Sequence, residues 1–191
     1  MAQLILIKHS VPEINPDVPP NQWPLSDLGR LRSEKLAEKL RAYRPDLIIS
    51  SLEPKAVETG RIIAAILGTP FETAQDLHEH DRSSNSSYTT QARFERQVAQ
   101  FFKNPDKLIF GRETANEAYF RYKTALASLI DNFSGDTLAV VSHGTVMALF
   151  IAHANKFDPF PFWKQLGLPS FVVLSLPEFG LLTDIENIED H

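Results

Sequence analysis

Three short polar segments, each directly after an apolar run, carry the side chains with which this sequence could do chemistry. They are Lys8-His9-Ser10, Ser50-Ser51 with Lys55 close behind, and Ser142-His143-Gly144-Thr145. Histidine changes its charge near neutral pH and can serve as a nucleophile or a proton carrier. A single histidine after a strand is more often a packed, hydrogen-bonded residue. Three such segments in equivalent positions favour one shared site.

Lys55 indicates that this site binds an anion. It lies in the first turn of a predicted helix, where the helix dipole disfavours a cation by about 0.3–1 kcal/mol. The backbone N–H groups of a helix start attract phosphate, and a bound anion would also favour the lysine. The alternative is that Glu53 or Glu58 simply neutralises Lys55. Gly144 and Thr145 open a second predicted helix directly after the histidine and could offer N–H groups to a phosphate.

The elements that must position these segments are predicted from apolar periodicity. Apolar runs at 4–7, 47–49, 137–141 and 171–176 predict strands, with weaker strands at 70–73 and 181–185. Helices are predicted at 26–43, 54–67, 94–102, 119–133 and 144–154, and a polar loop at 83–87. Ser26 offers the first helix an N-cap, and four leucines recur along that helix at helical spacing, namely Leu28, Leu31, Leu36 and Leu40.

Strands that alternate with helices predict an α/β fold with three layers, in which a largely parallel sheet is flanked by helices on both faces. In such sheets ligands bind at the carboxyl ends of the strands, where the three polar segments fall. The length of 191 residues favours one domain, 1–191, with a short helical insertion at about 84–110.

Composition excludes several classes of function. The chain has no cysteine, so disulfides, thiolate metal sites and a cysteine nucleophile are absent. The net charge of −5 and the lack of a basic stripe predict no nucleic-acid partner. No apolar run approaches the ~20 residues that span a bilayer, and the first residues lack the features of a signal peptide. We therefore expect no membrane partner and a cytoplasmic location.

The order of these motifs resembles the histidine phosphatase superfamily, also called the phosphoglycerate mutase-like superfamily. The similar blocks extend from residue 2 to about 150. They are the strand ending in Lys8-His9-Ser10, similar to the family's Arg-His-Gly; Trp23-Pro24-Leu25-Ser26-Asp27-Leu28-Gly29; Ser50-Ser51 with Pro54-Lys55-Ala56-Val57-Glu58-Thr59; Leu77-His78-Glu79; and Val140-Val141-Ser142-His143-Gly144. Gly111-Arg112-Glu113-Thr114 resembles a further helix start of the family, with one extra residue.

The sequence departs from the family pattern at several positions of the expected site. Lys8 and Lys55 stand where the family has arginines, and Ser10 stands where it has glycine. Asp81-Arg82-Ser83-Ser84 replaces the family's frequent Gly and Trp-Glu-Gly. The resemblance therefore implies the fold more firmly than it implies activity.

The resemblance implies catalytic roles for three residues. His9 would attack phosphorus and form a phosphohistidine that water then hydrolyses. His143 would bind a phosphoryl oxygen as an imidazolium. Glu79 would give a proton to the leaving oxygen and later activate water, a role that favours a raised carboxyl pKa. His80 and Asp81 lie beside Glu79 and remain alternative proton donors.

The remaining pocket residues would bind the substrate phosphate. Lys8 and Lys55 would neutralise charge, and Ser51, Gly144 and Thr145 would complete the pocket. The mechanism needs no metal and no cofactor, and the spacing of the histidines does not predict a metal site.

The function expected from these features is hydrolysis of a phosphomonoester on a small phosphorylated metabolite. A phosphoglycerate-type mutase is an alternative, although the segment after His9 and the short stretch from Glu79 to Gly111 do not match the family's mutases. A protein-phosphohistidine phosphatase is another alternative. The two lysines also motivate a phosphate-binding module without turnover. The sequence leaves the substrate and the oligomeric state open, and an oligomer is compatible with it. An aromatic run at 157–163 is expected to pack in the core, with a pocket wall or a dimer contact as alternatives.

Overall fold

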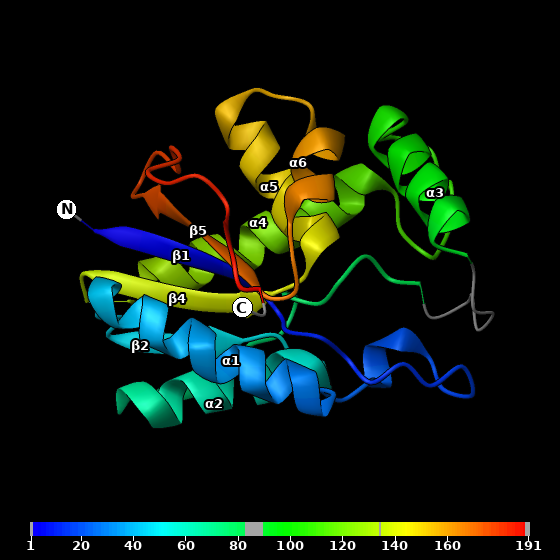
Figure 1. The fold of residues 1–191 in the computed structure, drawn as a ribbon. Helices are drawn as coiled ribbons and strands as arrows, with labels where there is room; N and C mark the ends of the chain where they lie inside the picture. Colours follow the sequence, from blue (N-terminus) through cyan, green and yellow to red (C-terminus); the bar gives the residue numbers. More distant parts are fainter. Residues whose placement is uncertain (1, 83–89, 134, 190–191) are drawn as a thin grey trace.

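A six-stranded sheet forms the centre of the protein in a computed structural model that describes residues 2–82, 90–133 and 135–189 (Figure 1). Its strand order is β3-β2-β4-β1-β5-β6. The strands are β1 (Gln3–Lys8), β2 (Leu47–Ser50), β3 (Phe71–Thr73), β4 (Thr137–Ser142), β5 (Ser170–Ser175) and β6 (Glu186–Asn187). The four strands from β3 to β1 are mutually parallel, whereas β5 and β6 are antiparallel to their neighbours. The prediction of a largely parallel sheet is confirmed.

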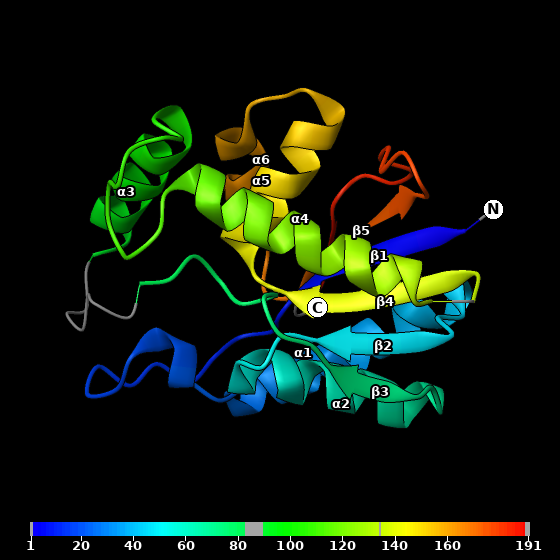
Figure 2. The same cartoon turned by 180° about the vertical axis from the view of Figure 1, so that it is seen from behind.

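Helices cover both faces of the sheet, which confirms the three layers (Figures 1 and 2). On one face lie α1 (Asp27–Leu40) and α2 (Pro54–Leu67), and on the other lie α4 (Ala115–Asp131) and α5 (Gly144–Asn155). Two more helices, α3 (Gln91–Lys103) and α6 (Pro159–Gln165), lie on that second side. The short 3-10 turns η1 (Pro20–Gln22) and η2 (Arg41–Tyr43) precede and follow α1 in the chain.

Local signals set the helix ends as predicted. The Ser26 hydroxyl accepts a hydrogen bond from the Gly29 N–H at 3.1 Å, which caps α1. Helix α2 begins at Pro54 and ends at Gly68, whose φ of 68° is the left-handed conformation that glycine adopts without strain.

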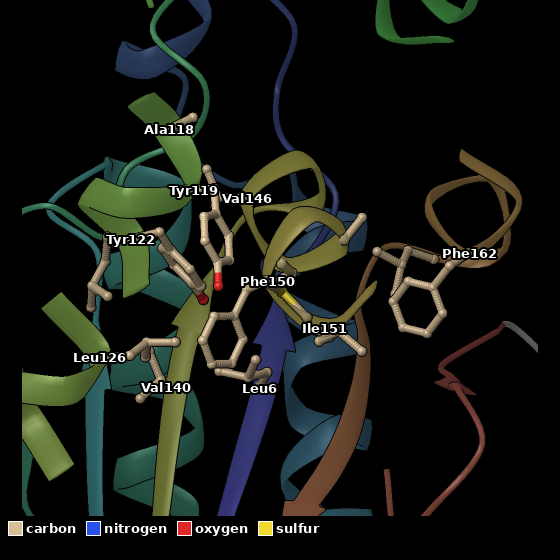
Figure 3. Close-up of a cluster of buried hydrophobic side chains, with 14 of the residues drawn as sticks. Leu6, Ala118, Tyr119, Tyr122, Leu126, Val140, Val146, Phe150, Ile151 and Phe162 are labelled. Carbon is tan, nitrogen blue, oxygen red and sulfur yellow. The ribbon is translucent and has the colours of Figure 1, made fainter. Parts of the chain in front are cut away.

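Strand β1 shows how the core is built from period-two alternation. Leu4 and Leu6 pack into the cluster beneath α4 and α5, which also contains Tyr122 and Phe150 (Figure 3). Ile5 and Ile7 pack on the opposite face, in the cluster formed with α1 and α2. All four β1 side chains are fully buried, and each contributes about 1.5–3 kcal/mol to folding. A strand buried on both faces reads as a continuous apolar run, which is why its position was predictable.

The predicted leucine face of α1 is only half right. Leu36 and Leu40 are buried, but Leu28 and Leu31 are 39% and 57% exposed. Gly29 is buried in their place because the segment before α1 lies against it: a Cβ at Gly29 would stand 2.1 Å from the Val11 carbonyl oxygen. The start of α1 is thus positioned by backbone contact and not by apolar side chains.

The aromatic run at 157–163 packs in the core as expected: Phe162 is buried, and Phe157, Phe160 and Trp163 pack against the same cluster. Most of the run lies in α6, which begins at Pro159, where the Asp158 carboxylate accepts from the Phe160 N–H at 3.0 Å. The prediction of an edge strand at 181–185 is wrong. The edge strand on this side of the sheet is β6, and Leu181 forms one isolated β-bridge with Leu174. The loop expected at 83–87, and the first part of the expected insertion at 84–110, lie outside the described residues; α3 lies in the rest of that range.

Candidate active site

The ends of three neighbouring parallel strands bring the predicted histidines together. In the register of the sheet, Lys8 is paired with Ser142, and the backbone pairing continues past the strand end because the His9 N–H donates to the Ser142 carbonyl at 3.0 Å. The ring centroids of His9 and His143 are 5.1 Å apart, with their planes at 60°. Both rings are buried, with 7% and 0% of the residue exposed.

His9 is held as a neutral imidazole in a defined tautomer. Its Nδ1 lies 2.7 Å from the Ser10 carbonyl oxygen, and since a carbonyl can only accept, Nδ1 carries the hydrogen. The Nε2 atom therefore keeps a lone pair. Burial lowers the pKa of His9 well below 6.5, and the positive charge of Lys55 lowers it further. The Ser10 backbone is fixed in turn, because its N–H donates to the Thr59 hydroxyl at 3.1 Å.

His143 is oriented by Ser51. The Ser51 hydroxyl oxygen lies 2.8 Å from His143 Nε2 and also accepts from the Glu53 N–H at 3.2 Å. The pKa of His143 is lowered well below 6.5, first by burial and then by Lys55, so the free protein holds a neutral ring and not the expected imidazolium. The Nδ1 atom is buried and has no hydrogen-bond partner among the described residues.

Lys55 forms a buried ion pair with Glu53. Of the two glutamates that the sequence left as possible counter-ions, Glu53 and not Glu58 neutralises it. Its Nζ lies 2.5 Å from Glu53 Oε2 and donates to the Pro20 carbonyl at 2.7 Å. Glu58 lies elsewhere, with its carboxylate 3.1 Å from an Arg30 guanidinium nitrogen. Burial lowers the pKa of Lys55, and Glu53 opposes that shift. Glu53 is thus a site residue that the sequence analysis named only as a possible counter-ion.

Lys8 is the last residue of β1 and lies beside Gly144. Its Nζ donates to the Leu166 carbonyl, at the end of α6, at 2.8 Å. Burial lowers the pKa of Lys8 to about 8, although Glu79 acts in the opposite direction. The lysine side chain runs over Gly144, where an added Cβ would stand 3.1 Å from Lys8 Cε. Gly144 therefore gives room to Lys8.

The Glu79 carboxylate is partly buried and is anchored by two backbone N–H groups. Its Oε1 accepts from the His80 N–H at 2.9 Å and its Oε2 from the Thr145 N–H at 3.2 Å. The Thr145 N–H expected on phosphate is therefore bound to Glu79. Burial raises the pKa of Glu79, but Arg82, His143 and the two N–H donors outweigh burial and leave the pKa below 4.5. The free protein thus lacks the raised pKa expected of a proton donor.

The two alternative proton donors occupy different surroundings. The His80 ring packs against Phe101 and Phe110, at centroid distances of 4.2 and 4.6 Å, and its Nε2 lies 3.2 Å from the Glu113 carbonyl oxygen. The Asp81 N–H donates to the Glu113 carboxylate at 2.9 Å. The His80 imidazole is thus engaged with two aromatic rings and a backbone carbonyl.

A partly buried ion pair holds the loop that carries Glu79. Arg121 Nη2 lies 2.6 Å from Glu113 Oε1, and both side chains are about 15% exposed. The same guanidinium donates to the carbonyl oxygens of Asp76, His78 and Glu79. No local pattern in the sequence indicates this clamp, because Arg121 of α4 contacts a loop that is more than 40 residues away in the chain.

A cavity of about 280 Å³ opens beside Lys55 and Glu79. It is lined by Pro20, Asn21, Glu53, Lys55, His78, Glu79, His80, Asp81 and Arg82. Arg82, which had no assigned role, brings a guanidinium to this wall and lies 4.6 Å from the Phe94 ring centroid. A larger cavity, of about 500 Å³, is lined by residues 164–168, 187–189 and Arg32 and contains none of the candidate catalytic side chains. Of the three candidate catalytic residues, Glu79 lines the smaller cavity.

The described residues contain no group of three or more histidine, aspartate or glutamate side chains arranged to hold a metal ion. In the same part of the chain, no helix is both long and apolar enough to cross a membrane.

Comparison with known proteins identifies the family. The model of the histidine phosphatase superfamily (branch 1) matches residues 4–180. The chain belongs to this superfamily. Among curated relatives of this histidine phosphatase chain, the uncharacterized phosphatase PhoE of Bacillus subtilis is 23% identical over 136 residues, which cover 71% of this chain and 67% of PhoE. Phosphoglycerate mutase-like protein 4 of Arabidopsis thaliana is 28% identical over 130 residues, or 64% of this chain and 56% of the relative.

Solved structures show the same fold over nearly the whole chain. A mycobacterial glucosyl-3-phosphoglycerate phosphatase in complex with VO3 superposes with a TM-score of 0.76 at 22% identity, covering 99% of this chain and 100% of the other. A phosphoserine phosphatase mutant from Entamoeba histolytica, in complex with phosphoserine, has a TM-score of 0.77 at 18% identity and covers 97% of both chains. The phosphoglycerate mutase-like fold expected from the sequence is confirmed.

Proposed function

We propose that this protein hydrolyses a phosphomonoester of a small metabolite through a phosphohistidine on His9. The observation that carries the proposal is the state of His9: a buried, neutral imidazole whose Nδ1 is tied to a carbonyl and whose ring lies 5.1 Å from a second buried histidine. A neutral ring with a free Nε2 lone pair is what nucleophilic attack requires. Membership of the histidine phosphatase superfamily supports the same reaction.

In the first step the Nε2 lone pair of His9 forms a bond to phosphorus while the bond between phosphorus and the ester oxygen breaks. The electron pair of that bond goes to the leaving oxygen, which takes a proton from the Glu79 carboxyl. Because the pKa of Glu79 is low in the free protein, the negative charge of the bound phosphoryl group must raise it.

In the second step water attacks the phosphohistidine and gives a proton to the Glu79 carboxylate. The bond between Nε2 and phosphorus breaks, inorganic phosphate leaves, and His9 returns to its neutral form. Covalent capture divides one slow hydrolysis into two easier transfers.

The phosphoryl oxygens would be held by His143 and the two lysines. The Ser51 hydroxyl, which already accepts from Glu53 N–H, can donate to His143 Nε2 and so leave hydrogen on the unpartnered Nδ1. By resemblance to the family motifs, Lys8 and Lys55 take the places of arginines. An ammonium supplies charge but not the planar fork of a guanidinium, so we expect binding to be kept and orientation to be weaker.

The proposal is tested by a screen of phosphorylated metabolites with phosphate release as the readout. Phosphoserine and 3-phosphoglyceric acid belong in the panel because solved relatives are in complex with them. We expect release by the wild type and none by His9→Asn. Release that persists in His9→Asn would overturn the mechanism.

A phosphate-binding module without turnover is the second candidate. The buried Glu53–Lys55 pair favours it, because this pair cancels a charge that would otherwise stabilise the transition state. Phosphate binding by the wild type, combined with no release from any member of a broad panel, would select this function.

A further inference from the structure

Glu53 places a buried carboxylate inside a pocket that is expected to bind an anion. The residue is the N-cap position of α2 and is 7% exposed. Its Oε2 is bound to Lys55 Nζ, and its Oε1 accepts from the Glu79 N–H at 3.0 Å. The same Oε1 lies 3.6 Å from His143 Nε2. One carboxylate therefore contacts a phosphate-binding lysine and the backbone of the candidate proton donor, and lies beside the second histidine.

The position of this carboxylate opposes the binding of phosphate in two ways. It neutralises Lys55. The side chains of Lys55 and Glu53 are only 7% and 8% exposed, so water screens the attraction between them little. It also adds a negative charge beside the phosphoryl site, and like charges brought close together repel each other. A phosphoryl group must draw Lys55 from Glu53 in order to bind it.

We propose that Glu53 competes with the phosphoryl group for Lys55, and thereby weakens the binding of inorganic phosphate and speeds its release as product. The proposal rests on the proposed function in placing the phosphoryl site at His9, but phosphate binding requires no turnover and can be measured separately. Glu53 is a positioning residue in this role, because it acts through Lys55.

The test uses Glu53→Gln, which removes the charge and keeps an oxygen that can accept from the Glu79 N–H. Titration calorimetry with inorganic phosphate at neutral pH should give a Kd at least about tenfold lower than that of the wild type. Glu58→Gln is the matched control: it makes the same change of charge on the same helix, but its carboxylate is paired with Arg30 outside the cavity lining. Its Kd should stay within about twofold of the wild type.

Two further variants make the result specific. In a Lys55→Gln background the gain from Glu53→Gln should shrink severalfold, since the competition requires the lysine. Glu53→Met removes the charge with an apolar side chain and should shift the Kd in the same direction, which covers the case that Glu53→Gln does not fold. An unchanged or weaker affinity in a folded Glu53 variant overturns the proposal.

The readouts separate this proposal from the proposed function. If phosphate binds more tightly in Glu53→Gln while no variant hydrolyses any substrate, the role of Glu53 stands and hydrolysis fails. If the wild type hydrolyses a substrate but Glu53→Gln leaves the Kd for phosphate and its inhibition constant unchanged, only the role of Glu53 fails.

Discussion

The imidazoles of His9 and His143 face each other edge to face, with centroids 5.1 Å apart, across the ends of the adjacent strands β1 and β4. Each ring is neutral because burial lowers its pKa well below 6.5. The pair thus combines a candidate nucleophile that is unprotonated at neutral pH with a neighbouring imidazole whose Nδ1 has no hydrogen-bond partner among the described residues.

His9 should become phosphorylated during turnover. A phosphoramidate is labile to acid and stable to base, so label from a phosphorylated substrate should survive a base quench and disappear after an acid quench. His9→Asn should abolish the label and lower kcat by about 10³-fold or more. His153→Asn is the control, because His153 is exposed and contacts Tyr119 away from the site. Label found on Ser10 by mass spectrometry would contradict the mechanism.

Glu79 should matter more for poor leaving groups than for good ones. An alkoxide needs a proton as it leaves, and general acid catalysis contributes roughly 10²–10⁴-fold. Glu79→Gln should therefore slow an alkyl phosphate by that factor and slow nitrophenyl phosphate much less, measured as kcat/KM. Asp81→Asn is the comparison, and should affect both substrates alike. Equal losses for the two substrates in Glu79→Gln would remove Glu79 from the role of the acid.

Activity should fall as the pH rises through the pKa of Lys8. The folded-state pKa is about 8, so the ammonium that binds the phosphoryl group is present below this pH and is lost above it. We expect kcat/KM to decline above pH 8, and Lys8→Arg to move the decline to higher pH, since a guanidinium stays charged.

The control for Lys8 is Lys164→Arg, in which the exposed ion pair with Glu95 keeps its charge. Its pH profile should match that of the wild type. A decline that stays at pH 8 in Lys8→Arg would assign it to another group, with Lys55 tested next.

The Arg121–Glu113 clamp should support both stability and catalysis. Arg121→Gln breaks a partly buried ion pair and three hydrogen bonds to carbonyl oxygens, which should lower the free energy of unfolding by about 1.5–3 kcal/mol, measured by urea denaturation. Loss of the clamp should also lower kcat, because the loop that it holds carries Glu79. Arg41→Gln removes the exposed pair with Glu38 and should change stability little. A normal kcat in a destabilised Arg121→Gln would confine the clamp to folding.

Local periodicity was enough to predict most of the fold. The apolar run of β1 and the spacing of α4 depend on neighbours in the chain, and so do the caps at Ser26 and Gly68. The exposed Leu28 and Leu31 mark the limit of this reasoning, because the buried face of α1 is chosen by backbone contact with Val11.

The sequence predicted in part which polar side chains meet at the site. Polar residues at three strand ends could be recognised in the sequence, because parallel strands present their carboxyl ends at one edge. The sequence could not choose between Glu53 and Glu58 for Lys55, since both lie within one helical turn of it.

Only the tertiary structure decided which charges pair and which groups ionise. Lys8 turns to the carbonyl of Leu166, which is 158 residues away in the chain, and Glu79 takes the N–H of Thr145. The neutral histidines and the ionised Glu79 follow from burial and from charges that distant segments bring within a few ångströms. Residue types and their spacing determine which groups can react, but a pKa depends on the surrounding dielectric and on neighbouring charges, and these exist only once the chain has folded.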